Sequence, residues 1–250
     1  MSIVSDSEPA FRIIHRDEWL CAIDKPCDIM VHQSRIGTDR QFVVQLLRDQ
    51  LGQRVWPVHR LDRATSGVLL FALDRDTASD VGKQFMAQEV TKRYLAVARG
   101  WVAEQGEIDH PLKKDKRADE GQPARTRFRR LATSELPIAL GEHQTVRHSL
   151  VEAFPETGRR HQIRRHFKHI SHHLIGDTTY GDGRHNRLFR QHLGCHRLLL
   201  HASVLALKHP ADGSILQLKA ELGGAFRELV ERLFGASILA ATDSSSPRVE

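Results

Sequence analysis

Apolar and polar residues alternate along several short stretches of the chain, which is the pattern of β-strands that bury one face. In residues 91–98, this alternation points Tyr94 and Ala96 to one face and Leu95 and Val97 to the other. A continuous apolar run over 68–73 predicts instead a strand that is covered on both faces. The predicted strands are residues 11–18, 19–24, 68–73, 91–98, 124–130, 149–154, 198–205 and 215–220.

Four other stretches repeat their apolar residues every three or four positions, as one face of a helix does. Asp39 can cap the start of the first, and Gly52 can end it in the left-handed conformation. Asp76 or Thr77 can cap the second. The predicted helices are residues 39–51, 76–90, 159–169 and 225–234, the last of which stops at Gly235.

This mixture of strands and helices, with several strands joined by short turns, predicts an α+β fold. We expect a mixed, largely antiparallel central sheet with flanking helices and loops. The chain has 250 residues, which suits one large domain, and we place that domain at 11–236. Residues 1–10 and 237–250 are small or polar, and we expect both ends to be flexible.

The composition is that of a globular protein, with 40% hydrophobic and 27% charged residues. Lys and Arg number 37 against 31 acidic residues, so the net charge is +6, as in many nucleic-acid-binding proteins. Cys21, Cys27 and Cys195 form no C-x-x-C pair, which argues against a disulfide framework or a structural zinc site. Because neither a leader peptide nor a membrane span is evident, we predict a cytoplasmic protein.

A basic segment runs over residues 113–130. We expect a mobile loop to about Pro123, followed by a strand on which Arg125, Arg127 and Arg129 face the same way. Such a row suits contacts with a phosphate backbone. It is equally typical of a solvated edge strand that its charges protect from aggregation.

In the helix predicted over 159–169, Ile163, Phe167 and the following Ile170 form the apolar stripe. Arg160, Arg164 and Lys168 are spaced four residues apart, so we expect one cationic ridge beside this stripe. The same region is rich in histidine, yet H-E-x-x-H is absent and no cysteine or acidic ligand is close in sequence. We therefore predict no metal site. The histidines concerned are His161, His166, His169, His172 and His173.

The turn before the apolar run 68–73 carries one carboxylate, Asp62, between Arg60 and Arg63. Catalytic groups often lie on such a turn at the edge of a rigid core. A solvated cluster of charges is the competing interpretation. No phosphate-binding glycine loop is present, and no second carboxylate that would suit a glycoside hydrolase lies close to Asp62 in sequence.

The chain resembles the RluA family of pseudouridine synthases, whose signature H-R-L-D-x-x-T-S-G is matched throughout by residues 59–67. The resemblance covers about residues 11–236. Asp28 stands where the early motif more often has glycine, which affects the local turn. The further matching segments are Asp24-Lys25-Pro26, Val31-His32, Lys92-Arg93-Tyr94, residues 157–166, Gly176-Asp177, Tyr180-Gly181 and His201-Ala202.

The resemblance implies an isomerase that converts uridine in RNA to pseudouridine without a cofactor. Asp62 corresponds to the catalytic aspartate, which acts as a nucleophile or general base. Arg164 corresponds to its arginine partner, and Tyr94 to the residue that packs on the flipped base. Arg60 corresponds to the arginine that helps to fill the space left by the base. The other residues that we expect to bind substrate are Lys25, His59, Arg160 and His161, with Arg125 and Arg127 from the basic segment.

Two features resemble the members of this family that modify the T-arm stem of tRNA. One is the short chain without an S4-type domain, and the other is the sequence of residues 181–187 and 195–198. We therefore expect tRNA as the partner, a monomer, and neither a metal nor a membrane. Relatives with the same motifs act on ribosomal RNA or on other tRNA positions, so the target stays open. Two hypotheses of other classes are a non-catalytic RNA-binding module and a metal-dependent hydrolase that uses the histidine-rich helix.

Overall fold

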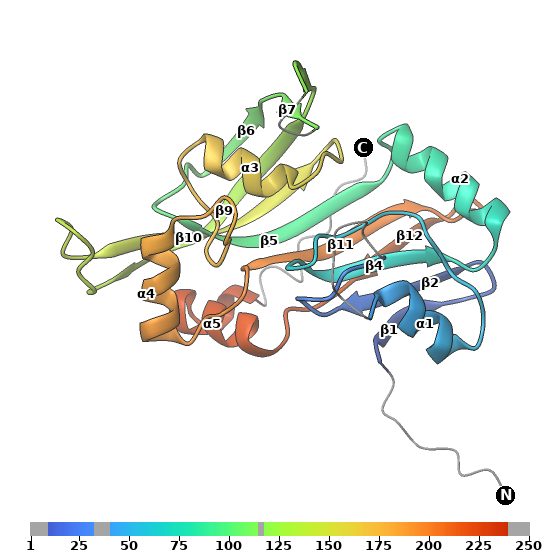
Figure 1. The fold of residues 1–250 in the computed structure, drawn as a ribbon, viewed down its shortest axis with the longest axis horizontal. Coiled ribbons are helices and arrows are strands. Elements are labelled where there is room, and N and C mark those ends of the chain that lie inside the picture. The colour runs from blue at the N-terminus through green and yellow to red at the C-terminus, as the bar shows by residue number, and fades with distance from the viewer. Residues whose placement is uncertain (1–9, 33–40, 115–117, 240–250) are drawn as a thin grey trace, which may run out of the picture.

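Strands and helices combine into one mixed sheet with helices packed on it (Figure 1). The computed structural model describes residues 10–32, 41–114 and 118–239. Its strands are β1 (Arg12–Arg16), β2 (Leu20–Lys25), β3 (Trp56–Pro57), β4 (Ser66–Ala72), β5 (Thr91–Arg99), β6 (Gln105–Asp109), β7 (Leu112–Lys113), β8 (Gly121–Gln122), β9 (Arg125–Leu136), β10 (Val146–Pro155), β11 (Leu200–Lys208) and β12 (Ile215–Lys219). Its helices are α1 (Val43–Leu51), α2 (Arg75–Met86), α3 (Gln162–His169), α4 (Gly183–Leu193) and α5 (Gly224–Phe234).

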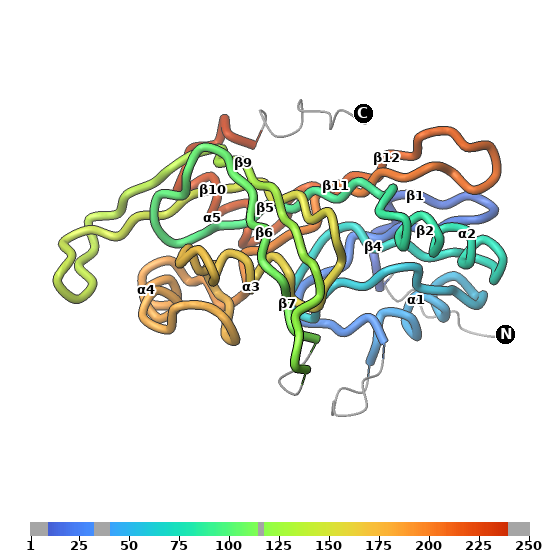
Figure 2. Tube along the Cα trace, turned by 90° about the horizontal axis from the view of Figure 1, so that it is seen from above, coloured from blue at the N-terminus to red at the C-terminus, as the bar shows by residue number. Residues whose placement is uncertain are grey.

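The main sheet has the strand order β1-β2-β4-β11-β5-β10-β9-β6 in the described part of the chain. Neighbouring strands along this path are antiparallel except β4 and β11, which are parallel. The predicted α+β fold with a mixed, largely antiparallel sheet is therefore confirmed. Figures 1 and 2 both place α1 and α2 at one end of the molecule and α4 with the tip of the β9–β10 hairpin at the other.

Strand β5 separates two parts of the core. Tyr94 and Ala96 lie with the apolar side chains of α3, whereas Leu95 and Val97 pack with those of α4 and α5. The predicted alternation is thus confirmed. At the other end of the sheet, every residue of β4 is buried, because α1 covers one of its faces and α2 the other.

Gly67 allows β4 to lie unusually close to β11. Its φ is +109°, and a Cβ atom at this position would lie 2.2 Å from the carbonyl oxygen of Ala202. Only glycine adopts this conformation readily and leaves that space free. The turn that precedes β4 is thereby held against the centre of the sheet.

Several predicted boundaries differ from those observed. The first helix begins at Val43, and the expected cap Asp39 lies outside the described residues. Asp74 caps α2 by accepting the Thr77 N–H, so Asp76 and Thr77 were the wrong candidates. Helix α3 begins at 162 rather than 159, and α4 was not predicted at all.

The C-terminal boundary also differs, because residues 237–239 are helical and Leu239 is 8% exposed within the core. Part of the expected loop before Pro123 pairs as the β7–β8 hairpin. None of the helices in the described ranges is both long and apolar enough to cross a membrane.

Candidate active site

A buried lysine supports the turn that carries Asp62. The Lys25 ammonium is fully buried and donates to the carbonyl oxygens of Pro26 (2.7 Å), Arg63 (3.1 Å) and Thr65 (2.8 Å). Burial lowers the pKa of Lys25 to about 8. With three acceptors, the ammonium has no donor left for RNA. Lys25 therefore holds the turn in shape, whereas the sequence had suggested that it binds substrate.

Asp62 lies at one end of a chain of charged side chains. Its Oδ2 accepts a hydrogen bond from Nη1 of Arg164 at 3.1 Å. The other edge of the same guanidinium donates to both carboxylate oxygens of Asp177, each at 2.8 Å. The Arg164 and Asp177 side chains are only 7% and 1% exposed, whereas that of Asp62 is 20% exposed. The arginine is thus fixed in the interior and presents one N–H to the accessible carboxylate.

The Arg164–Asp177 pair is charged despite its burial. Burial opposes the charge of Arg164, but the hydrogen bonds and charge of Asp177, with the charge of Asp62, raise its pKa. Burial likewise opposes the charge of Asp177, but Arg164 and the N–H groups of Tyr180 and Thr179 lower its pKa. Asp177 therefore positions Arg164 and carries its counter-charge.

His161 lies on the other side of Asp62, just before α3. Its φ of +55° is uncommon for a residue other than glycine. Its Nδ1 lies 3.1 Å from the hydroxyl of Tyr180, and its Nε2 lies 3.7 Å from Oδ1 of Asp62. Burial lowers the pKa of His161, although Asp62 acts in the opposite direction. The neutral imidazole therefore stands beside the carboxylate at pH 7.

Asp62, His161 and Arg164 line a cavity of about 590 Å³, a size that suits a small ligand or a single nucleotide. Its wall combines the turn 59–62, the end of α2, strand β5, and residues 157–164. Tyr94 lies on this wall, and burial raises the pKa of its phenol, with Asp62 acting in the same direction. Tyr94 is therefore a neutral phenol at physiological pH.

Cationic side chains surround the same cavity. Arg60 and Arg160 are exposed at its wall, and neither guanidinium has an ion-pair partner among the described residues. Lys92 donates to the carbonyls of Glu156 (3.1 Å) and Thr157 (3.4 Å), and burial lowers its pKa to about 8. The cavity is therefore bordered by positive charge that can meet an anionic ligand.

His59 also lines the cavity, but its ring is part of the scaffold. Its Nε2 accepts the N–H of Leu70 at 3.0 Å, and the ring stacks on Phe85. Burial lowers the pKa of His59 to about 3, so the ring remains neutral. His59, which we expected to bind substrate, thus links the turn to β4 through its hydrogen bond and to α2 through its stacked ring.

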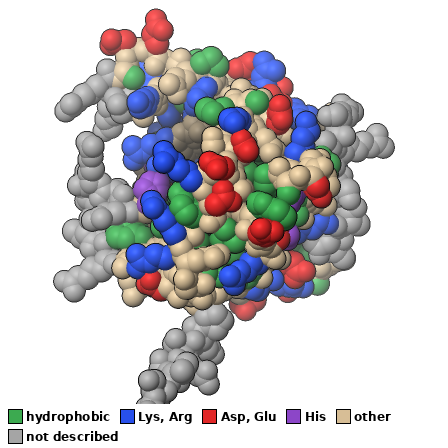
Figure 3. Space-filling model, turned by 90° about the vertical axis from the view of Figure 1, so that its right-hand side faces the viewer, with side chains coloured by type: hydrophobic (Ala, Val, Ile, Leu, Met, Phe, Trp, Pro, Cys, Tyr) green, Lys and Arg blue, Asp and Glu red, His purple; other side chains and the backbone are tan. Residues whose placement is uncertain are grey.

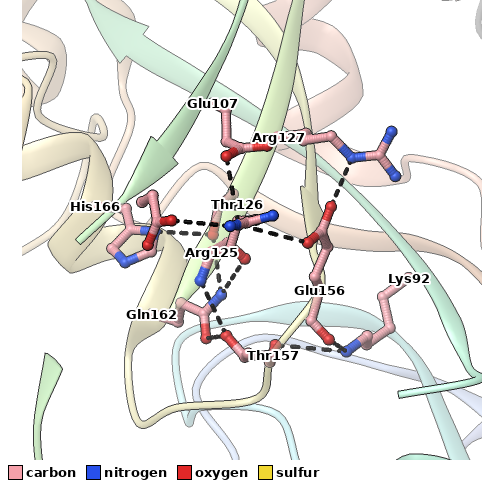
Figure 4. Close-up of polar contacts among 10 residues, drawn as sticks. Lys92, Glu107, Arg125, Thr126, Arg127, Glu156, Thr157, Gln162 and His166 are labelled. Atoms are coloured by element: carbon pink, nitrogen blue, oxygen red, sulfur yellow. Dashed lines mark hydrogen bonds and ion pairs between the residues drawn. The ribbon is translucent and has the colours of Figure 1, made fainter. Parts of the chain in front are cut away.

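The loop between β10 and α3 is held by Gln162, which is 5% exposed (Figure 4). Its Oε1 accepts hydrogen bonds from the hydroxyl of Thr157 (2.7 Å) and the N–H of Arg159 (3.0 Å). Its Nε2 donates to the carbonyl of Arg125 (2.9 Å) and the hydroxyl of Thr126 (3.0 Å). This network fixes the loop that brings positive charge to the cavity.

The histidines of α3 do not gather around one point. His166 hydrogen-bonds to Thr126 and to the carbonyl of His110, and the ring of His169 stacks on that of His110 at 3.7 Å. Within the described ranges, no three His, Cys, Asp or Glu side chains are grouped so that they could hold a metal ion.

The family model described as RNA pseudouridylate synthase matches residues 20–169, which include Asp62, Tyr94 and Arg164. The chain belongs to the RNA pseudouridylate synthase family. Members of this family isomerise uridine to pseudouridine, so the chain is an isomerase of the RluA type.

Two curated relatives are named tRNA pseudouridine synthase C. The protein from Vibrio cholerae is 48% identical over 87% of this chain and 93% of its own length. The protein from Yersinia pestis is 46% identical over 91% of this chain and 92% of its own length. Among solved structures, human RNA pseudouridylate synthase domain containing 4 is 25% identical, with a TM-score of 0.70 over 88% of this chain and 92% of that one.

Arg125 and Arg127, which the sequence suggested as phosphate-binding residues of this pseudouridine synthase, are already paired. Arg125 lies 3.0 Å from Asp109 and 3.3 Å from Glu107, and Arg127 lies 2.8 Å from Glu156 (Figure 4). Neither residue lines the cavity. The alternation of exposed arginines on β9 was correct, but their charge is largely compensated by neighbouring carboxylates.

The expected cationic ridge on α3 was wrong. Arg160 precedes the helix, and Arg164 turns inward to Asp177, so only Lys168 is an exposed cation of α3 at this spacing. The sequence had marked Asp177 and Tyr180 as part of the family pattern without giving them a role. The structure brings both beside Arg164 and His161, 13 or more residues away along the chain.

Proposed function

We propose that this pseudouridine synthase modifies a uridine in the T-arm stem of tRNA, at the position numbered 65, with Asp62 as the catalytic carboxylate. The observation that carries this proposal is the placement of Asp62. It is accessible from a cavity of nucleotide size, and the buried Arg164 donates to its Oδ2 at 3.1 Å. The relatives named tRNA pseudouridine synthase C support the choice of tRNA.

The reaction breaks the bond between ribose C1′ and uracil N1 and forms a bond between C1′ and C5. One proton leaves C5 and one is gained at N1, so the isomerisation requires no oxidant and consumes no water. Asp62 acts as a nucleophile at the ribose or the base, or as a general base. Arg164 orients its carboxylate and supplies the positive charge beside it.

Tyr94 packs against the extruded uracil in this proposal. Its raised pKa keeps the phenol protonated, so it contributes an aromatic face and a hydroxyl group rather than a phenolate. A protonated Tyr94 can accept the C5 proton only if another base takes its own proton, and we assign that role to Asp62, whose charge acts on the phenol. Neutral His161 borders the same carboxylate without competing for it as a cation.

Taking a uridine out of a stem costs a few kcal/mol of lost stacking and pairing. We propose that Arg60 fills the space that the base leaves, and that Arg160 binds a flanking phosphate. Both guanidiniums are exposed at the cavity and have no carboxylate partner in the described part of the chain. A tRNA substrate also implies a cytoplasmic location.

The test is tritium release from tRNA transcripts labelled at C5 of uridine, followed by nearest-neighbour mapping of the modified position. We expect release at one T-arm uridine with the wild type and none with Asp62→Ala. Release only from ribosomal RNA or from another tRNA position would overturn the assigned target. An absence of release from every RNA would favour the non-catalytic binding module.

A further inference from the structure

Helix α4 exposes three arginines on its outer side. Arg184, Arg187 and Arg190 are all exposed, whereas Leu188 and Phe189 are buried in the core. At 3.6 residues per turn, the three arginines lie within an arc of about 120°, opposite the buried side chains. We call these three residues the α4 arginine face.

The arginines of the α4 arginine face form no ion pair within the described residues, although Glu142 lines the same pocket as Arg184. None of the three guanidiniums has a side-chain hydrogen bond in the described part of the chain either. The acidic residue next to the helix, Asp182, is already used, because it caps α4 and pairs with Arg99 at 2.6 Å. In this respect α4 differs from β9, because the exposed arginines of β9 form ion pairs with carboxylates.

The α4 arginine face is joined rigidly to the active site. Asn186, which is 7% exposed, accepts the N–H of Gly176 at 2.7 Å and donates to the carbonyl of Asp177 at 2.8 Å. Asp177 holds Arg164, the partner of Asp62. The helix therefore stands at a fixed distance from the catalytic carboxylate.

The short connection along the chain limits the distance between α4 and the residues beside the cavity. Tyr180, whose hydroxyl contacts His161, is four residues before Arg184, which limits their Cα separation to about 14 Å. The α4 helix has 11 residues, or about 16 Å of length. The helix therefore begins close along the chain to a residue that contacts His161, and Figures 1 and 2 both place α4 at one end of the molecule.

The opposite end of the molecule has a different surface. Figure 3 shows basic and acidic side chains mixed there, and the exposed pairs Arg48–Asp49 (2.7 Å) and Lys83–Asp80 (2.7 Å) lie on α1 and α2. Mixed surfaces of this kind attract a polyanion weakly. A row of arginines without ion pairs, in contrast, matches the regular phosphates of a nucleic-acid stem.

We propose that the α4 arginine face binds the phosphate backbone of the substrate RNA, at a distance from the uridine in the cavity. The inference rests on the proposed function and adds a second contact to it. The fixed connection through Asn186 and Asp177 would let this contact set the register of the stem relative to Asp62. The α4 arginine face would then contribute to RNA affinity and to the choice of uridine, whereas the isomerisation takes place in the cavity.

The test compares the wild type with a variant carrying Arg184→Gln, Arg187→Gln and Arg190→Gln. The dissociation constant for unmodified tRNA is measured by fluorescence anisotropy across a series of KCl concentrations. Each lost phosphate contact lowers the slope of log Kd against log salt by about 0.9 for a duplex, so we expect a decrease of roughly 2 to 3. We also expect KM for tRNA to rise by about tenfold, with kcat at saturating tRNA unchanged.

Two further variants serve as controls. A triple Arg→Lys variant at the same positions keeps the charge, and we expect it to retain most of the wild-type slope. A variant with Arg16→Gln, Arg75→Gln and Arg232→Gln loses the same net charge from exposed arginines on β1, α2 and α5. We expect this variant to keep the wild-type slope. Circular dichroism melts confirm that all variants are folded.

An α4 triple Gln variant with the wild-type slope and KM would overturn the inference, and would assign the face to something other than RNA. An equal loss in the β1–α2–α5 control would also overturn it, because the effect would then be one of net charge. The proposed function is judged separately, from the tritium released by the wild type on the same tRNA. Wild-type turnover with no effect of the α4 substitutions would refute only the α4 contact.

Discussion

Replacing Asp177 by Asn tests whether this buried carboxylate positions Arg164 for catalysis. The substitution keeps the size of the side chain and the acceptor that receives the N–H groups of Thr179 and Tyr180. It removes the negative charge and places an NH₂ group against the Arg164 guanidinium, which has no acceptor to offer. Arg164 stays charged and retains Asp62 as its remaining counter-charge.

The magnitude follows from the geometry of the pair. Asp177 and Arg164 are joined by two hydrogen bonds of 2.8 Å in a site where the side chains are 1% and 7% exposed. Breaking a buried pair of this kind costs about 3 to 5 kcal/mol, and we expect about 3 kcal/mol because Asp62 still faces the arginine. At this chain length that corresponds to a decrease in melting temperature of about 6 to 12 °C.

Activity should fall more sharply than binding. A guanidinium that shifts by an ångström no longer orients Asp62, and such a displacement costs about 100-fold in kcat. KM for tRNA should change little, because Asp177 is buried away from the RNA. The assays are a thermal melt followed by circular dichroism, and single-turnover tritium release with enzyme in excess.

Asp80→Asn is the matched control, since it makes the same chemical change in an exposed pair with Lys83 (57% and 67% exposed). We expect it to cost about 0.5 kcal/mol or less and to leave kcat unchanged. An Asp177→Asn variant that matched the wild type in both melting temperature and kcat would refute the positioning role.

Two other predictions concern stability. Although burial opposes its charge, hydrogen bonds from two histidines and two backbone N–H groups lower the pKa of Asp17 to about 2. Its contribution to stability is therefore complete above about pH 4 and is lost as pH falls toward 2, and urea unfolding of Asp17→Asn should lack this dependence. Gly67→Ala should destabilise the fold by about 3 kcal/mol or more in the same assay, because its Cβ would overlap the carbonyl of Ala202. Gly82→Ala, in an open position of α2, should instead stabilise it slightly; equal effects at both glycines would contradict the role of Gly67.

Much of the sheet could be predicted because its strands alternate cleanly or are continuously apolar. The two faces of β5 and the doubly covered β4 follow directly from side-chain direction in a strand. The proposed catalytic roles of Asp62, Tyr94 and Arg164 came from the family resemblance. No periodicity or spacing connects Asp62 with Arg164, which lie 102 residues apart and meet only through the fold.

Helix α4 was missed because its buried side includes His185 and Asn186, which are polar and break the apolar repeat. Asn186 is buried because it binds backbone groups near Asp177, a reason that a hydropathy pattern does not contain. The pairing of Arg125 and Arg127 was missed for a similar reason. Their partners come from β6 and from Glu156, the residue after β10, so the pairing of these charges can be recognised only once the strand register is known.

The central claim is that Asp62 performs the chemistry rather than holding the RNA. The measurement that tests it most directly is tritium release from C5-labelled tRNA by Asp62→Asn, with tRNA affinity measured on the same preparation and Asp80→Asn as the control. We predict wild-type affinity and no release from Asp62→Asn, with normal release from the control. Turnover by Asp62→Asn at a rate near that of the wild type would contradict the assignment of Asp62 as the catalytic residue.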